Sequence, residues 1–172
     1  MTPPLELTSV PRWAVEPTVA PADPSATSCS AFAIGPEAAE IAQAWAKETV
    51  APTRLHLMGD LADAVAALDA DVAGACVGWR VLLAGSLVDV LRLRAHALDH
   101  GLADDEIAIA TTRTDELALA CVHCSTVGVA RTAVGDVVAC EGCNRDLLVY
   151  HHVSRRKAAF LGFQVDAETW EA

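Results

Sequence analysis

The sequence predicts an α/β domain, a parallel sheet flanked by helices, followed by a small metal ribbon with four cysteines. Short apolar runs alternate with amphipathic helical stripes between residues 29 and 117, which is the pattern of βαβ units. Two Cys-x-x-Cys pairs follow, with fifteen residues between them. We therefore divide the chain into an extended arm (1–28), an α/β degenerate nucleotide-binding-like domain (29–117) and a zinc-ribbon or rubredoxin-like domain with a C-terminal tail (118–172).

Residues 1–28 are rich in proline and have few periodic apolar positions. Such a composition favours an extended arm, laid along a partner or along the domain surface. Trp13 has two interpretations within this arm: an anchor on a partner, or a side chain packed on its own domain.

The α/β domain is expected to contain four strands and three helices. Proline at position 36 suits the first turn of a helix, where its missing N–H costs nothing. Asp60 and Ser86 are expected to cap the next two helices, and Gly101 to follow the third. The expected strands are 31–34, 54–58, 79–84 and 106–111. The expected apolar stripes are Ala38, Ile41, Ala42 and Trp45; Leu61, Ala64, Val65 and Leu68; and Leu87, Val90, Leu91, Ala97 and Leu98.

A sheet of this kind binds nucleotides through glycine-rich turns beyond its strands. Gly35 stands alone, and Gly85 with Ser86 is too short a motif. We therefore expect no cofactor-binding residue and no catalytic residue in this domain. His96 and His100 have the i,i+4 spacing of a two-histidine metal site, but without the zincin pattern we interpret them as surface histidines.

Four cysteines at this spacing predict one tetrahedral metal site, formed by Cys121, Cys124, Cys140 and Cys143. A hairpin between the pairs is expected to fold the second onto the first. Zinc is the default metal, and a mononuclear iron centre is the alternative. Because four cysteines complete the coordination shell, we expect His123 to lie outside it. For the same reason we expect the site to be structural. The remaining cysteines, Cys29 and Cys76, are expected in the core.

Composition limits the partners. The net charge is -11 and most of the acidic excess lies in residues 1–120, which argues against nucleic acid. Cysteine use and a start without a signal-peptide pattern indicate the cytoplasm. The most apolar stretch, 72–91, is interrupted by Arg80 and Asp89, so we expect no membrane span.

A cationic cluster follows the second cysteine pair. Adjacent arginines beside apolar sequence suit carboxylate or phosphate recognition at an interface, although a solvated patch is the alternative. The residues proposed to bind a partner are His151, His152, Ser154, Arg155 and Arg156.

These motifs together resemble a known family. Both cysteine pairs, the run 147–156 and Phe-Leu-Gly-Phe at 160–163 resemble the carboxy-terminal domain of the small accessory subunit of bacterial dimethylamine monooxygenase. Val153 stands where that family usually has an aromatic residue. The α/β part is similar, more weakly, to the nucleotide-binding half of ferredoxin reductases of the phthalate-dioxygenase-reductase kind, with 84–86 in place of their Cys-Gly-Pro turn.

The resemblance implies a non-catalytic subunit of an NADPH- and O2-dependent enzyme that converts dimethylamine to methylamine and formaldehyde. It also implies two partners, a catalytic haem-containing oxygenase subunit and a flavin/iron–sulfur reductase subunit. Haem, FMN and the Fe–S cluster are then expected only in those subunits. Two alternatives remain open: a rubredoxin-like iron electron-transfer protein and a stand-alone nucleotide-binding regulator.

Overall fold

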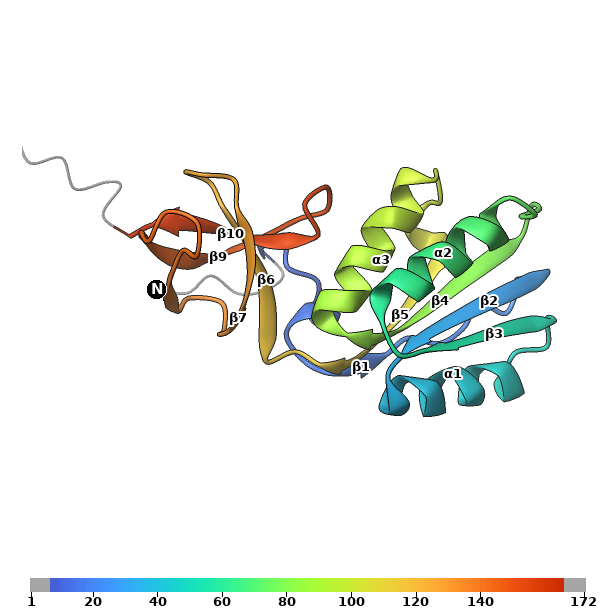
Figure 1. The fold of residues 1–172 in the computed structure, drawn as a ribbon. Helices are drawn as coiled ribbons and strands as arrows, with labels where there is room; N and C mark the ends of the chain where they lie inside the picture. The colour runs from blue at the N-terminus through green and yellow to red at the C-terminus, as the bar shows by residue number, and fades with distance from the viewer. Residues whose placement is uncertain (1–6, 166–172) are drawn as a thin grey trace, which may run out of the picture.

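The computed structural model describes residues 7–165, which form two five-stranded sheets lying side by side (Figure 1). We call the first sheet and its helices the α/β unit, and the second the C-terminal sheet. The α/β unit contains β1 (Thr18–Val19), β2 (Ser28–Ile34), α1 (Pro36–Glu48), β3 (Thr53–Met58), α2 (Leu61–Val72), β4 (Trp79–Ser86), α3 (Leu87–Asp99) and β5 (Ile107–Arg113). Two short 3₁₀ turns, Arg12–Ala14 and Asp104–Glu106, complete it.

The sheet of the α/β unit has the order β1-β5-β4-β2-β3. Strands β5, β4, β2 and β3 are parallel, with α1 on one face and α2 and α3 on the other (Figure 1). Strand β1 pairs antiparallel with β5, so the sheet is mixed and the prediction of a parallel sheet is wrong at this edge. The reason is that the open edge of β5 offers unpaired backbone groups, which the N-terminal segment satisfies.

The predicted helix boundaries are confirmed by their caps. The Asp63 N–H donates to the Asp60 side chain at 3.0 Å, and the Asp89 N–H donates to Ser86 Oγ at 3.3 Å. Gly101, just beyond α3, has φ +93°, the left-handed conformation that ends helices.

The C-terminal sheet has the order β7-β6-β10-β9-β8. Its strands β7 and β8 lie at opposite edges, so the predicted hairpin between the cysteine pairs is wrong. Each pairs antiparallel with the strand across its own cysteine pair, β7 with β6 and β8 with β9, because each cysteine pair is itself the turn of a hairpin. The strands are β6 (Glu116–Cys121), β7 (Val127–Arg131), β8 (Val137–Ala139), β9 (Asp146–Ser154) and β10 (Ala159–Gln164).

Helix α3 joins the two sheets. Its Val90, Leu93 and Ala97 pack on the α/β unit. Leu87 and Leu91, predicted to face that same core, instead pack in the core of the C-terminal sheet. The helix is apolar on two faces because it has a sheet on each side.

The N-terminal segment lies along both sheets. Val10 and Ala14 pack in the core of the C-terminal sheet, and the Trp45 Nε1–H donates to the Ala20 carbonyl at 2.9 Å. Trp13 is packed within its own chain, with the Arg94 guanidinium 5.9 Å from its ring centre. Of the two interpretations of Trp13, packing on its own chain is the observed one.

The two cysteines outside the metal pattern differ. Cys29 is buried, and burial raises the pKa of its thiol. Cys76 is exposed, so its predicted place in the core is wrong. It lies in the turn between α2 and β4, where the chain reverses at the surface. Within the described residues no helix combines the length and apolarity needed to cross a bilayer.

Candidate metal centre

The two cysteine pairs have the same backbone conformation. In the first knuckle (residues 121–126) the Ser125 N–H donates to the Cys121 carbonyl at 3.0 Å; in the second (140–145) the Asn144 N–H donates to the Cys140 carbonyl at 2.8 Å. Ser125 and Asn144 have positive φ, 64° and 57°, which turns the chain after each second cysteine. Each pair thus directs both of its sulfurs to the same side.

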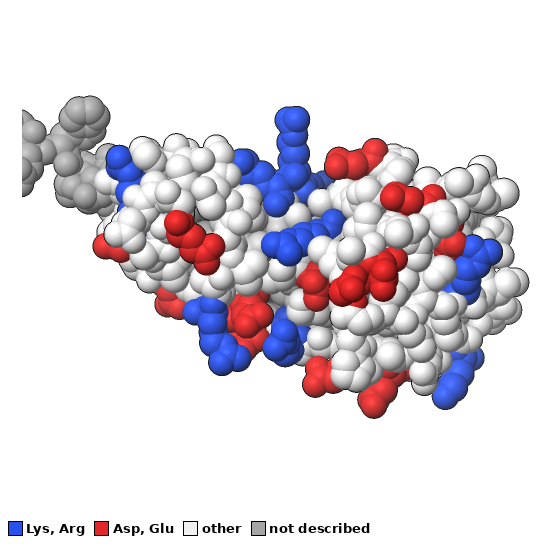
Figure 2. All heavy atoms as spheres, viewed as in Figure 1, with Lys and Arg blue, Asp and Glu red and all other residues white. Residues whose placement is uncertain are grey.

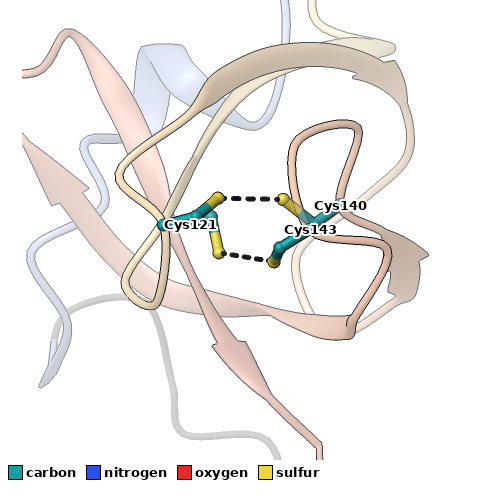
Figure 3. Close-up of side chains that lie close together, drawn as sticks. Cys121, Cys140 and Cys143 are labelled. Carbon is teal, nitrogen blue, oxygen red and sulfur yellow. Dashed lines mark hydrogen bonds between the residues drawn. The ribbon is translucent and has the colours of Figure 1, made fainter.

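The four sulfurs converge on one point (Figure 3). Cys121 Sγ lies 3.8 Å from Cys143 Sγ, and Cys124 Sγ lies 3.6 Å from Cys140 Sγ. A tetrahedral ion with Zn–S bonds of about 2.3 Å requires sulfurs about 3.8 Å apart. The predicted ligands are therefore together, and their spacing fits one metal ion with a closed shell.

The knuckles are packed tightly against each other at Gly142. A Cβ added there would lie 2.8 Å from Thr126 Cβ and 3.1 Å from Cys124 Sγ. The Cys124 sulfur is also hydrogen-bonded to Thr126 Oγ1 at 3.3 Å. Sequence reasoning missed Thr126, whose only signal is its place two residues after a cysteine pair. His123 occupies in the first knuckle the place of Gly142 in the second, and it is exposed and outside the sulfur cluster, as predicted.

Thiols this close cannot all ionise without a cation. Hydrogen bonds from the Thr126 side chain and backbone lower the pKa of Cys124 to about 6. The Arg145 backbone lowers the pKa of Cys143, but burial and the neighbouring thiols together raise it to about 12. A divalent ion removes this conflict because it stabilises all four thiolates at once.

The predicted partner-binding residues are divided between the two faces of the C-terminal sheet. His151 points inward, and its buried Nε2 has no hydrogen-bond partner among residues 7–165. His152 is exposed on the outer face, with Nδ1 2.8 Å from Ser9 Oγ. Ser154 Oγ accepts from the Lys157 N–H at 3.2 Å, which closes the turn between β9 and β10.

The two arginines also differ. Arg155 pairs with Asp104 of the α/β unit at 2.7 Å, and Asp104 also accepts from Arg94 of α3. Arg156 is exposed at the β9–β10 turn and makes no ion pair within the described part of the chain. Figure 2 shows basic side chains gathered in the middle of the molecule, between the two sheets. Arg155 is therefore already used to hold the sheets together, whereas Arg156 is available.

Polar and charged side chains line the crevice where a nucleotide would be expected. The order of strands reverses at β2 and β4, whose ends open on a cavity of about 330 Å³. There Ser86 Oγ donates to Asp89 at 2.6 Å, and Glu37 adds a second carboxylate. Arg113, which sequence reasoning missed because it comes from β5, lines the same cavity but pairs with Glu116 at 3.8 Å.

The part of the chain that carries the four cysteines matches a known family. Residues 118–163 match the family model of the dimethylamine monooxygenase subunit DmmA-like C-terminal domain. Over these residues the chain is similar to that domain. The matched residues include most of β6, both knuckles and β9, and thus all four cysteines.

A curated relative supports the same resemblance. The chain is 35% identical over 108 residues to the heme-dependent oxidative N-demethylase delta subunit of Ectopseudomonas mendocina. The match covers 63% of this chain and 61% of that relative, so the chain spans less than two thirds of the relative's length. No solved structure matches the chain, and the similarity of the α/β unit to ferredoxin reductases stays a prediction.

Proposed function

We propose that this chain is a non-catalytic accessory subunit of a multisubunit oxidative N-demethylase, in which it binds a structural metal and docks onto a catalytic partner. The observation that carries the proposal is the closed four-sulfur site inside the DmmA-like domain. A closed shell leaves no coordination position for substrate or oxygen, so the site suits structure rather than catalysis. The delta-subunit name of the relative supports membership of a complex.

In the proposed complex, dimethylamine, O2 and NADPH with a proton react to give methylamine, formaldehyde, water and NADP+. The chemistry belongs to the partner subunits, a haem-containing oxygenase and a reductase with FMN and an Fe–S cluster. This chain contributes a rigid docking element, because the metal would join the β6–β7 and β8–β9 hairpins, which form the two edges of the C-terminal sheet.

We propose zinc as the ion. Four thiolates at these distances also suit iron, which would make the chain a rubredoxin-like electron-transfer protein. Elemental analysis of the freshly purified, reduced full chain is expected to give about one zinc per chain, with no absorption in the visible range. A red protein with a stoichiometric iron content would establish the iron alternative instead.

The docking surface we propose lies on the outer face of β9 and β10. Tyr150 and Phe163, both exposed, pack edge to face there with ring centres 5.0 Å apart. His152 follows two residues after Tyr150 and therefore points to the same side. Aromatic residues and arginine are enriched at interface hot spots. Arg156 adds an arginine at the turn that joins these two strands, and Ser154 fixes that turn.

The charge test uses Arg156→Ala in the full chain. Arg92→Ala is the matched control, since Arg92 is also an exposed arginine but lies on α3, outside the proposed docking surface. Loss of a desolvated pair weakens assembly by about 2–5 kcal/mol, while zinc content and folding stay unchanged. Binding of the purified oxygenase subunit is measured by calorimetry at low and high salt. Equal affinities for both variants would show that the basic turn is only solvated surface.

The subunit role itself is tested in the native host. A tagged full chain is expected to co-purify with a haem-containing oxygenase, and the complex to oxidise NADPH only when dimethylamine is added. Removal of this chain should lower the activity through loss of assembly. A tagged chain that purifies alone, from cells that actively oxidise dimethylamine, would contradict the proposal.

A further inference from the structure

A second group of metal-binding side chains lies on the α/β unit, away from the cysteines. His96 lies in the last turn of α3, His100 directly follows that helix, and Asp69 comes from α2. Their ligand atoms lie within 4.8 Å of one another. Sequence reasoning interpreted His96 and His100 as surface histidines, and nothing in the local sequence links Asp69 to them.

The packing of the two helices positions all three side chains. Because His96 and His100 are four residues apart, they lie one turn apart on the same side of the helix. That side faces α2, and the two imidazole rings meet edge to face at 4.8 Å. Asp69 lies opposite them near the end of α2, and all three side chains are only partly covered, so water and ions reach them.

The three atoms form a triangle. His96 Nε2 and His100 Nε2 are 3.3 Å apart, and each lies close to the same oxygen, Asp69 Oδ1, at 2.6 and 2.7 Å. Ligands about 2.0–2.1 Å from one ion lie about 2.9–3.4 Å apart, depending on coordination number. The nitrogen separation already fits, and the oxygen must move by only a few tenths of an ångström.

Asp71, which is also on α2, makes ion pairs with a different geometry from that of Asp69. Asp71 accepts from Arg54 and His56, but through different oxygens, and Asp71 is buried. At Asp69 two imidazole nitrogens converge on one oxygen at the surface. The hydrogen bonds also lower the pKa of Asp69, which keeps it a carboxylate.

We propose that Asp69, His96 and His100 form a second metal site, for a divalent ion that favours imidazole nitrogen, with Zn2+ as the physiological candidate. Three protein ligands leave at least one position for water or for a side chain of a partner. The ion would clamp the end of α2 to the end of α3. This inference is independent of the proposed subunit function.

The test is calorimetric titration of Zn2+ into the full chain, after its four-cysteine site has been saturated with zinc and excess metal removed. The wild type is expected to bind one further equivalent and to show a thermal midpoint that rises with Zn2+ concentration. Asp69→Asn and His96→Gln are each expected to weaken this binding at least about 10-fold. The matched control is Asp99→Asn, which removes an exposed carboxylate from the same helix as His96 and should bind as the wild type does.

Retention of the first, cysteine-bound zinc shows that each variant is folded. No second equivalent in the wild type at millimolar Zn2+ would overturn the proposal. So would equal binding by Asp69→Asn and the wild type, because the site would then lack its third ligand. An equal loss in Asp99→Asn would also overturn it, since the effect would then reflect only net charge.

Discussion

The two sheets are stabilised in different ways. The α/β unit buries large side chains such as Phe32, Leu68 and Leu83 between a sheet and helices, and its core needs no other group. The C-terminal sheet fills part of its core with Leu87 and Leu91 of α3. Two of the cysteines, Cys121 and Cys140, are themselves members of that core. The first sheet therefore folds by apolar burial, and we expect the second to depend on its metal.

The same contrast holds for ligands. At the strand ends of the α/β unit, the N-terminus of α3 is satisfied by Ser86 and Asp89 of its own chain. In the C-terminal sheet, four sulfurs converge at a spacing that suits a metal ion. At the first site the chain supplies the partners of its own polar groups, and we expect the second to be completed by an added ion.

Cys140→Ser is expected to give the largest effect, because it removes both a ligand and a core side chain. Metal affinity should fall by more than about 100-fold, since changes outside the ligand shell alone cost 10–100-fold. The C-terminal sheet should lose amide-exchange protection while the strands of the α/β unit keep theirs. Elemental analysis and hydrogen exchange measure the two effects.

The matched control is Cys76→Ser, the same change at an exposed cysteine outside the cluster. It should keep full metal content and full protection. If Cys140→Ser instead removes protection evenly from both sheets, the two sheets fold as one cooperative unit through α3 and are not stabilised separately.

Gly142→Ala tests the contact between the knuckles. The new methyl group would press on Thr126 and on the Cys124 sulfur, so the two knuckles must move apart. Overpacking of this kind costs about 1–3 kcal/mol, which should appear as weaker zinc binding in competition with a chelator. His123→Ala, at the equivalent and exposed position of the other knuckle, should bind zinc as the wild type does. Equal affinities for the two variants would show that Thr126 and Cys124 move aside without weakening zinc binding.

Acid should weaken the α/β unit through Asp71. Burial raises the pKa of Asp71, but hydrogen bonds from Ser30, His56 and Arg54 outweigh it and hold the pKa below its ordinary value of 3.8. Below that ordinary value the unfolded chain binds the extra proton first. The contribution of Asp71 is thus complete above about pH 4 and is lost as pH falls through the lower, folded-state pKa.

The measurement is urea unfolding of the wild type and Asp71→Asn between pH 6 and pH 3. Near pH 6 the variant should be less stable by about 1.5–3 kcal/mol, the usual range for hydrogen bonds to a charged group. The difference should shrink as the pH is lowered. A difference that stays constant over this range would mean that the Asp71 charge contributes nothing to folding.

How much of the fold could be predicted depended on whether the signal was local. The caps Asp60 and Ser86 and the helix after Pro36 were predicted correctly, because each rests on residues within one turn. The inward stripe of α3 was predicted wrongly at Leu87 and Leu91. An apolar helix face does not reveal which of two sheets covers it.

The candidate sites show the same limit. The four cysteines were predicted from spacing, since a knuckle is a local turn, but the pairing of β7 and β8 was not. Asp69 meets His96 and His100 only because α2 packs beside α3, and Arg155 meets Asp104 only because the sheets adjoin. Contacts between distant elements follow from packing, which no short pattern encodes.

The smallest expected effect is in the titration of NADPH or NADH into the isolated full chain, where we expect no binding stronger than about 1 mM. A dinucleotide needs free N–H groups at a helix N-terminus and glycines that allow close approach. Here Pro36 removes one donor, and Ser86 caps α3 while its hydroxyl is held by Asp89. Glu37 and Asp89 would both repel a pyrophosphate. Asp89→Ala removes one of these charges and frees the Ser86 hydroxyl, yet Pro36 and Glu37 remain, so binding should stay weak. Micromolar affinity of the wild type by calorimetry would show that the crevice opens, and the α/β unit would then be a working nucleotide domain.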